Sequence, residues 1–319
     1  MRRPAKKPPQ WGRRITIAGS LLFALWPASP LGPATVKLDP LPERVAPAAA
    51  QQDIVPEAVW LVSRGSEADL YSNGLRVENR YRVSNVGRPL DGRPAGIVFH
   101  TTESHQAPFA EERSRELTRI GANLIAYIRR HKSYHFVIDR FGRVNRVVEE
   151  ADAANHAGWS IWADARREYV GLNQIFLGVA LEAETAAQGI TPAQLQAGKT
   201  LIAMLRSKYE IAAANCVTHG QVSVNPHNFR VGHHTDWGGS FPFTDLGLPD
   251  NYSLPLPAIA HFGFRSDGAF AQAAGPRLLK SVELAERQLA GNAAARGVMV
   301  EAYRAELRKQ FQGFKEQIP

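Results

Sequence analysis

Cysteine is almost absent from this 319-residue chain, and no apolar run is long enough to span a bilayer. Cys216 is the single cysteine, so no disulfide can form within the chain. We expect Cys216 to be a small buried apolar residue. Without disulfides, stability must come from an apolar core or a bound metal. The 44% of apolar residues suffices for one large domain with appendages, or for two small domains.

Acidic residues are missing from the first 34 positions, which supply six of the eight net positive charges. The rest of the chain therefore carries only +2, too little to indicate a nucleic-acid partner. The basic stretch precedes the short apolar run Ile15–Trp26, the order found in signal peptides. We expect residues 1–34 to be a signal peptide or N-terminal anchor, with no other membrane span. Residues 35–57, rich in proline and alanine, are expected to be a linker.

A signal of this kind predicts that the protein is exported. Its destination is then the periplasm, the cell wall or the medium. The sequence leaves open whether the signal is cleaved or stays as an anchor, and it does not predict the oligomeric state.

Strand and helix patterns alternate over residues 58–257 and predict a mixed α/β domain, with a central mixed β-sheet flanked by helices. The apolar, β-branched run Gly96–Thr102 predicts a central strand covered on both faces. Further along, Ile175–Glu184 predicts a second strand. The other elements that we expect are short strands within Val59–Val83, a helix over Phe109–Arg130, a hairpin over Ser133–Val148, and a short strand through Val217.

Helix signals in the second half of the chain are clear at one point. Thr191 is a helix N-cap, Pro192 takes the first helical position, and Gln194 completes a capping box. Residues 258–319 are expected to form a C-terminal helical extension, with a split at Gly291 or Gly297. The extension either docks on the α/β domain or binds a partner or the cell wall.

The segment Ala213–Phe243 concentrates residue types that bind metals. Four of the chain's ten histidines lie in it, followed by an aspartate: His219, His227, His233, His234 and Asp236. Imidazoles and a carboxylate this dense between glycines and a proline indicate a metal site on a loop, or else a polar surface loop. His100, at the end of the central strand, is either a further ligand or a core residue.

Six stretches of the sequence follow one another in the order of a known family. They are Gly96-Ile-Val-Phe-His-Thr-Thr, Ser133-Tyr-His-Phe-Val-Ile-Asp-Arg-Phe-Gly-Arg-Val, Asn155-His-Ala-Gly, Leu177-Gly-Val-Ala-Leu-Glu, Val217-Thr-His-Gly and His234-Thr-Asp-Trp-Gly. Together they resemble the type 2 zinc N-acetylmuramoyl-L-alanine amidases, which include phage amidase-lysozymes and peptidoglycan recognition proteins. The resemblance covers about residues 95–245. It implies the amidase fold for the domain, with peptidoglycan or its muropeptides as substrate.

The resemblance implies that Zn²⁺ is held by His100, His219 and Asp236. Three protein ligands leave the fourth tetrahedral position open for water, which distinguishes a catalytic zinc from a structural one. The implied reaction is hydrolysis of the amide between N-acetylmuramic acid and L-alanine. The loop between the last two ligands departs from the family, so His227 or His233 stays an alternative to Asp236.

Two residues match positions that act in catalysis in the family. Tyr134 corresponds to a tyrosine beside the metal, where a phenol orients water or donates a hydrogen bond to the oxyanion. His234 stands where many members carry lysine, and it can take an electrophilic or acid role if it is protonated. Three further residues, in or beside the matching stretches, are expected to contact substrate: Thr101, His156 and Trp159.

One departure concerns the general base. Ala180 occupies the position where many bacterial members carry a catalytic glutamate. The enzyme then relies on Tyr134, as phage-type members do, or Glu182 substitutes from one pleat repeat further along the same face, roughly 6.5–7 Å away. Alternatively, catalysis is lost and the domain is a peptidoglycan-binding module. A zinc hydrolase of another amide is the third hypothesis.

Overall fold

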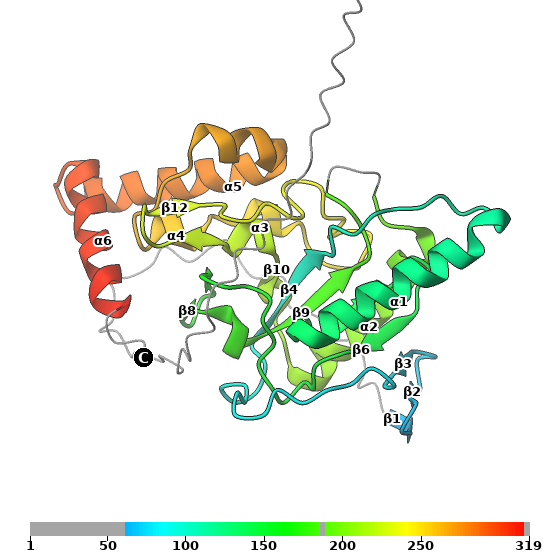
Figure 1. The fold of residues 1–319 in the computed structure, drawn as a ribbon. Coiled ribbons are helices and arrows are strands. Elements are labelled where there is room, and N and C mark those ends of the chain that lie inside the picture. Colours follow the sequence, from blue (N-terminus) through cyan, green and yellow to red (C-terminus); the bar gives the residue numbers. More distant parts are fainter. Residues whose placement is uncertain (1–60, 186–188, 316–319) are drawn as a thin grey trace, which may run out of the picture. The chain divides into compact units, whose positions relative to one another are not determined.

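The computed structural model describes residues 61–185 and 189–315, and one mixed β-sheet runs through its centre (Figure 1). Within the described residues the strand order of this sheet is β1-β2-β3-β6-β5-β9-β4-β10. The predicted signal or anchor (1–34) and linker (35–57) lie outside the described residues. The strands are β1 (Leu61–Arg64), β2 (Ala68–Tyr71), β3 (Arg76–Glu78), β4 (Gly96–Thr101), β5 (Phe136–Ile138), β6 (Val144–Arg146), β9 (Phe176–Leu181) and β10 (Cys216–Thr218).

The sheet combines parallel and antiparallel pairs. Strand β4 lies between β9 and β10, and both pairs are parallel, as is the pairing of β9 with β5. The predicted hairpin pairs β5 with β6 in antiparallel fashion, and β1 to β3 extend the sheet beyond β6. The predicted fold class, a mixed sheet flanked by helices, is therefore confirmed.

Two helices cover opposite faces of the sheet, because side chains along each strand alternate between faces. From β9, Leu177, Val179 and Leu181 pack with residues of α2 (Pro192–Tyr209) in the main core. Ala180 points the other way and packs with Ile125 and Ile128 of α1 (Ser114–His131), which follows a 3-10 turn, η1 (Glu111–Arg113).

The predicted start of α2 is confirmed. The backbone N–H of Gln194 donates to the hydroxyl of Thr191 at 3.1 Å, and the Gln194 side chain accepts the Thr191 N–H at 3.0 Å. This capping box satisfies helix N–H groups that would otherwise lack partners. Cys216 is buried, as expected.

Helices α5 (Gly268–Ala295) and α6 (Val300–Lys315) form the predicted C-terminal extension. Gly275 has a non-helical φ of 66°, and Pro276 follows it, so α5 is kinked there. Gly297, at φ 68°, separates the two helices, whereas Gly291 lies inside α5. Phe270, Ala274, Leu278 and Val282 of α5 and Phe311 of α6 share the main apolar core with the sheet, so the extension packs on the α/β domain.

Several short elements escaped the sequence analysis, because each is too short to show a period. They are the hairpin of β7 (Ile161–Ala163) and β8 (Glu168–Val170), the hairpin of β11 (Val224–Asn225) and β12 (Arg230–Val231), the helices α3 (His219–Val222) and α4 (Pro257–Ala260), and the 3-10 turns η2 (Leu172–Gln174), η3 (Ala213–Asn215) and η4 (Asn251–Ser253). Among residues 61–185 and 189–315, no helix has the length and apolar character needed to cross a membrane.

Candidate active site

The sheet register brings His100 and His219 together. Strands β4 and β10 are parallel neighbours, with Phe99 opposite Thr218. The next residue on β4 is His100, and the next after β10 is His219, the first residue of α3. Their ring centroids lie 4.6 Å apart, and both side chains are buried. The site thus lies at the carboxyl ends of parallel strands, where α/β sheets bind ligands.

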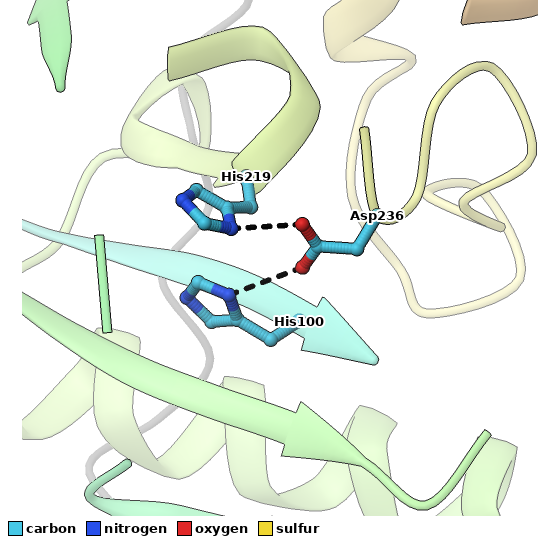
Figure 2. Close-up of side chains that lie close together, drawn as sticks. All are labelled: His100, His219 and Asp236. Atoms are coloured by element: carbon cyan, nitrogen blue, oxygen red, sulfur yellow. Dashed lines mark hydrogen bonds and ion pairs between the residues drawn. The ribbon is translucent and has the colours of Figure 1, made fainter. Parts of the chain in front are cut away.

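Asp236 reaches these two histidines from a loop 136 residues after His100. One carboxylate oxygen lies 2.8 Å from Nδ1 of His219 and the other lies 3.2 Å from Nδ1 of His100 (Figure 2). Ligand-type atoms of the three residues all lie within 4.8 Å of one another. The structure therefore brings together the three predicted metal ligands.

The loop that carries Asp236 packs against α5. A side chain at Gly239 would place its Cβ 2.7 Å from the carbonyl oxygen of Ala274, and one at Gly238 would lie 2.8 Å from that of Ala273. Between these glycines and Asp236, Trp237 takes a left-handed φ of 58°, and its carbonyl accepts the hydroxyl of Tyr252. Only glycine allows the loop to approach the helix backbone this closely.

The three side chains fit a zinc ion by their chemistry. Burial, and then the nearby His219, lower the pKa of His100 to about 4, so His100 is a neutral ligand at neutral pH. Burial alone would raise the pKa of Asp236, but His219 and His100 outweigh it and keep the carboxylate ionised. Nε2 of His219 is buried without a hydrogen-bond partner among the described residues. Two imidazoles and one carboxylate are a donor set that Zn²⁺ accepts.

Tyr134, at the start of the hairpin, lies beside the same histidine. Its half-buried ring has its centroid 5.0 Å from that of His100. Burial raises the pKa of Tyr134, and the negative charge of Asp236 raises it further. The phenol therefore stays protonated and can act as a hydrogen-bond donor, consistent with the predicted contact with an oxyanion.

His234 stacks on a ligand. Its ring lies parallel to that of His219, with centroids 4.7 Å apart and 20° between the planes. Burial, and then the neighbouring His219, lower the pKa of His234, which favours a neutral ring that can form hydrogen bonds. The predicted acid role requires a protonated ring, which this environment disfavours, and the role remains a prediction. The alternative ligands His227 and His233 are exposed and lie outside the three-residue group.

Glu182 lies beyond the end of β9, away from the register position of His100. Its carboxylate accepts the backbone N–H of Arg140 at 3.1 Å, and its carbonyl accepts the side chain of Gln194 at 3.1 Å. The position beside His100 in the register is Ala180, which packs with apolar residues of α1. These contacts give Glu182 a structural role. Its catalytic role remains a prediction.

The three predicted substrate contacts lie in different settings. The hydroxyl of buried Thr101 donates to the carboxylate of Glu103, and half-buried Trp159 packs on the main core with the amino group of Lys315 5.7 Å from its ring centroid. Their contact with substrate remains a prediction. His156 is buried, and both its ring nitrogens form hydrogen bonds with protein atoms. We therefore describe it as a partner of His100 and not as a residue on an open surface.

Two residues of the site region were missed by the sequence analysis. His135 is buried beside His156, with ring centroids 5.8 Å apart. Its place next to Tyr134 in the predicted hairpin was the available signal. Glu103 has a left-handed φ of 49° and also contributes to the raised pKa of Tyr134. No sequence signal marked Glu103.

Comparison with known proteins agrees with this site. Residues 90–239 match the family model described as N-acetylmuramoyl-L-alanine amidase, a segment that contains all three ligand residues. No curated protein matches the chain. Among solved structures, the amidase LysC from Clostridium intestinale URNW is 21% identical, with 52% of this chain and 93% of that chain covered and a TM-score of 0.32.

Two further solved structures are similar at the same level. AmiD from E. coli, in complex with the substrate anhydro-N-acetylmuramic acid-L-Ala-D-gamma-Glu-L-Lys, is 22% identical over 57% of this chain and 65% of that chain, with a TM-score of 0.37. AmpDh3 from Pseudomonas aeruginosa, in complex with anhydromuramic pentapeptide, is 22% identical over 51% of this chain and 63% of that chain, with a TM-score of 0.36. These likenesses are distant, and the family model is the decisive match. Through residues 90–239, the chain belongs to the type 2 family of N-acetylmuramoyl-L-alanine amidases, which are amide-hydrolysing enzymes.

Proposed function

We propose that this protein is an exported, zinc-dependent amidase that hydrolyses the bond between N-acetylmuramic acid and L-alanine in peptidoglycan. One observation carries the proposal. His100, His219 and Asp236, from three separate parts of the chain, meet within 4.8 Å inside the segment that matches the amidase family. Two buried imidazoles beside a partly buried carboxylate are the donor types that bind a zinc ion.

The roles of the side chains follow from their placement. His100, His219 and Asp236 would hold the ion. Bound Zn²⁺ supplies a Lewis acid that polarises the amide carbonyl and acidifies water. The Tyr134 phenol, kept protonated by its surroundings, donates a hydrogen bond to the carbonyl oxygen as negative charge develops on it. The neutral ring of His234 can add a second hydrogen bond at the same edge of the site.

The amide nitrogen must gain a proton when the bond breaks. Glu182 is tied to Arg140, and the Ala180 position is apolar, so neither supplies that proton in this arrangement. We assign proton transfer to the water that attacks the carbonyl, whose proton is released beside the leaving nitrogen. This places the protein with amidases that work without the glutamate on this strand.

The decisive experiment is digestion of purified peptidoglycan by the zinc-loaded protein, with mass spectrometry of the soluble products. We expect free stem peptides that begin with L-alanine, and none from a His100→Ala variant. Tight binding to peptidoglycan without release, at equal zinc content, would identify the non-catalytic binding module instead. Release from other amides but not from peptidoglycan would identify a different amidohydrolase.

Export is a separate part of the proposal. It rests on the basic and then apolar order of residues 1–34 and on the location of peptidoglycan outside the cell membrane. Fractionation of bacterial cells should recover the full chain outside the cytoplasm and a chain that lacks residues 1–34 inside it. Recovery of both chains in the cytoplasm would contradict export and leave the enzymatic proposal intact.

A further inference from the structure

His156 forms hydrogen bonds through both nitrogens of its ring. Its Nε2 lies 3.1 Å from the carbonyl oxygen of Phe176 on β9. A carbonyl oxygen only accepts hydrogen bonds, so Nε2 of His156 must carry the proton and donate. In a neutral imidazole the other nitrogen, Nδ1, is then an acceptor.

That acceptor faces the metal ligand on β4. Nδ1 of His156 lies 3.2 Å from Nε2 of His100, and the two rings meet edge to face with centroids 5.3 Å apart. Because His156 accepts here, this bond forms when Nε2 of His100 carries the proton and donates. On the other side of the ring, Nδ1 of His100 faces the Asp236 carboxylate at 3.2 Å, and this carboxylate is a second acceptor for the single proton of a neutral ring. A cation held by Nδ1 and Asp236 would remove that competition and leave the proton on Nε2, where His156 accepts it.

The surroundings of His156 hold its ring in this orientation. The side chain of Asn173 accepts the backbone N–H groups of His156 at 3.0 Å and of Ala157 at 2.7 Å. On the sheet side, Gly178 leaves the space that the ring occupies, since a Cβ at that position would lie 2.7 Å from Cγ of His156. Strand β9 thus supplies both the anchoring carbonyl and the room for the ring.

We propose that His156 is a positioning residue that draws the proton of His100 to Nε2, so that His100 presents an unprotonated Nδ1 to the metal. The chain of bonds runs from the Phe176 carbonyl through His156 to His100. Outer partners of this kind orient metal-binding histidines and make them stronger ligands. The inference rests on the proposed zinc function for the identity of the ion, whereas the effect of His156 on the balance between the two His100 tautomers is present in the protein without metal.

The test compares two substitutions of similar polarity. In His156→Asn the side-chain oxygen lies near the place of Nδ1 and can still accept from His100. In His156→Gln the terminal amide lies near the place of Nε2, so the bond to Phe176 survives but the acceptor for His100 is lost. His135→Asn is the matched control, because His135 is buried beside His156 but bonds to Asp152 and Gly178 instead of His100.

Zinc affinity is measured by competition with a fluorescent chelator, and the tautomer of His100 by ¹⁵N NMR of the metal-free protein. We expect His156→Gln to weaken zinc binding about 10–100-fold and to shift the His100 proton away from Nε2. His156→Asn should keep most of the affinity and the wild-type tautomer, and His135→Asn should change neither. Thermal unfolding of each metal-free variant shows whether it is folded.

Wild-type affinity and an unchanged His100 tautomer in folded His156→Gln would overturn the proposal. Equal loss in His135→Asn would overturn it as well, because any buried histidine would then have the same effect. If His156→Gln does not fold, Gly178→Ala displaces the ring and should give the same change in tautomer. A wild-type protein that binds zinc in this way but does not digest peptidoglycan would refute the proposed function and leave the role of His156 standing.

Discussion

The amide N–H of Gly220 donates a hydrogen bond to the carbonyl oxygen of Asp236 at 3.2 Å. This bond joins two parts of the site, because Gly220 follows the proposed ligand His219 and Asp236 is the proposed third ligand. The backbone therefore holds two ligands in a fixed relation without help from their side chains. A metal ion that binds here finds its ligands already arranged, which lowers the entropy lost on binding.

Replacement of Asp236 should separate the true third ligand from the alternatives on the same loop. We expect Asp236→Ala to lose stoichiometric zinc and to release no stem peptide, because it removes the charged ligand. His227→Ala, at an exposed position in the turn between β11 and β12, should keep both. Metal content after dialysis and product release are measured on the same samples. The opposite pattern would move the third ligand to His227.

Packing of α5 on the metal loop predicts an effect of Gly239. Its Cβ in Gly239→Ala would meet the Ala274 carbonyl at 2.7 Å, so the loop must shift. We expect a loss of about 1–3 kcal/mol in the free energy of unfolding and weaker zinc binding. Gly291→Ala is the matched control within α5, since its Cβ meets nothing within 4 Å, and it should stabilise the helix by up to about 1 kcal/mol. Urea unfolding with and without zinc measures both.

The phenol of Tyr134 should act in the reaction and not in metal binding. Tyr134→Phe keeps the ring beside His100 but removes the hydrogen-bond donor. We expect kcat to fall by about 10²–10³-fold, as for the loss of one oxyanion donor, with zinc affinity unchanged. Tyr303→Phe, which lies in the apolar packing between α5 and α6, should keep full activity. If the activity of Tyr134→Phe fell in proportion to its zinc content, the tyrosine would instead support metal binding.

Substitution of Glu182 tests whether this residue is the general base. Because its carboxylate accepts the N–H of Arg140 and is buried, Glu182→Gln should lower stability and leave kcat within about threefold of wild type. Kinetics and urea unfolding of the purified variant measure the two effects. A fall in kcat of a hundredfold or more (~10²) in a fully folded variant would identify Glu182 as the base.

A buried charge cluster away from the metal predicts the acid stability of the fold. Arg146 bonds to Asp69 at 2.7 Å and to Glu150 at 2.8 Å, and so ties β2 to β6. Burial alone would raise the pKa of Glu150, but Arg146 and then Lys208 lower it to about 2, from a usual value of 4.5. This stabilisation is complete above the unfolded value and is lost as the pH falls from about 4.5 to about 2.

The expected loss across that range is on the order of 3 kcal/mol. Glu150→Gln should be less stable than the wild type at neutral pH, and the difference should shrink on acidification. Chemical unfolding at pH 7, 5 and 3 measures both curves. A constant difference between the two proteins over this range would contradict the assignment.

The local order of the chain could be read from its residues because it depends on near neighbours. The capping box at Thr191, the hairpin over β5 and β6, and the buried strand β4 each follow from turn chemistry or from the two-residue period of strands. His100, His219 and Asp236 were also identified from the sequence, but only through their agreement with a family pattern. Their types and spacing alone left His227 and His233 as equal candidates.

Only the tertiary structure decided how these side chains face one another. The parallel pairing of β4 with β10 places His219 beside His100, and the close approach of α5 to Gly238 and Gly239 fixes the loop of Asp236. The tertiary structure also places His156 in a buried position in contact with His100, whereas the sequence analysis expected it to contact substrate. Such relations depend on which strands pair and which helix covers a loop, and these long-range contacts form only when the whole core packs.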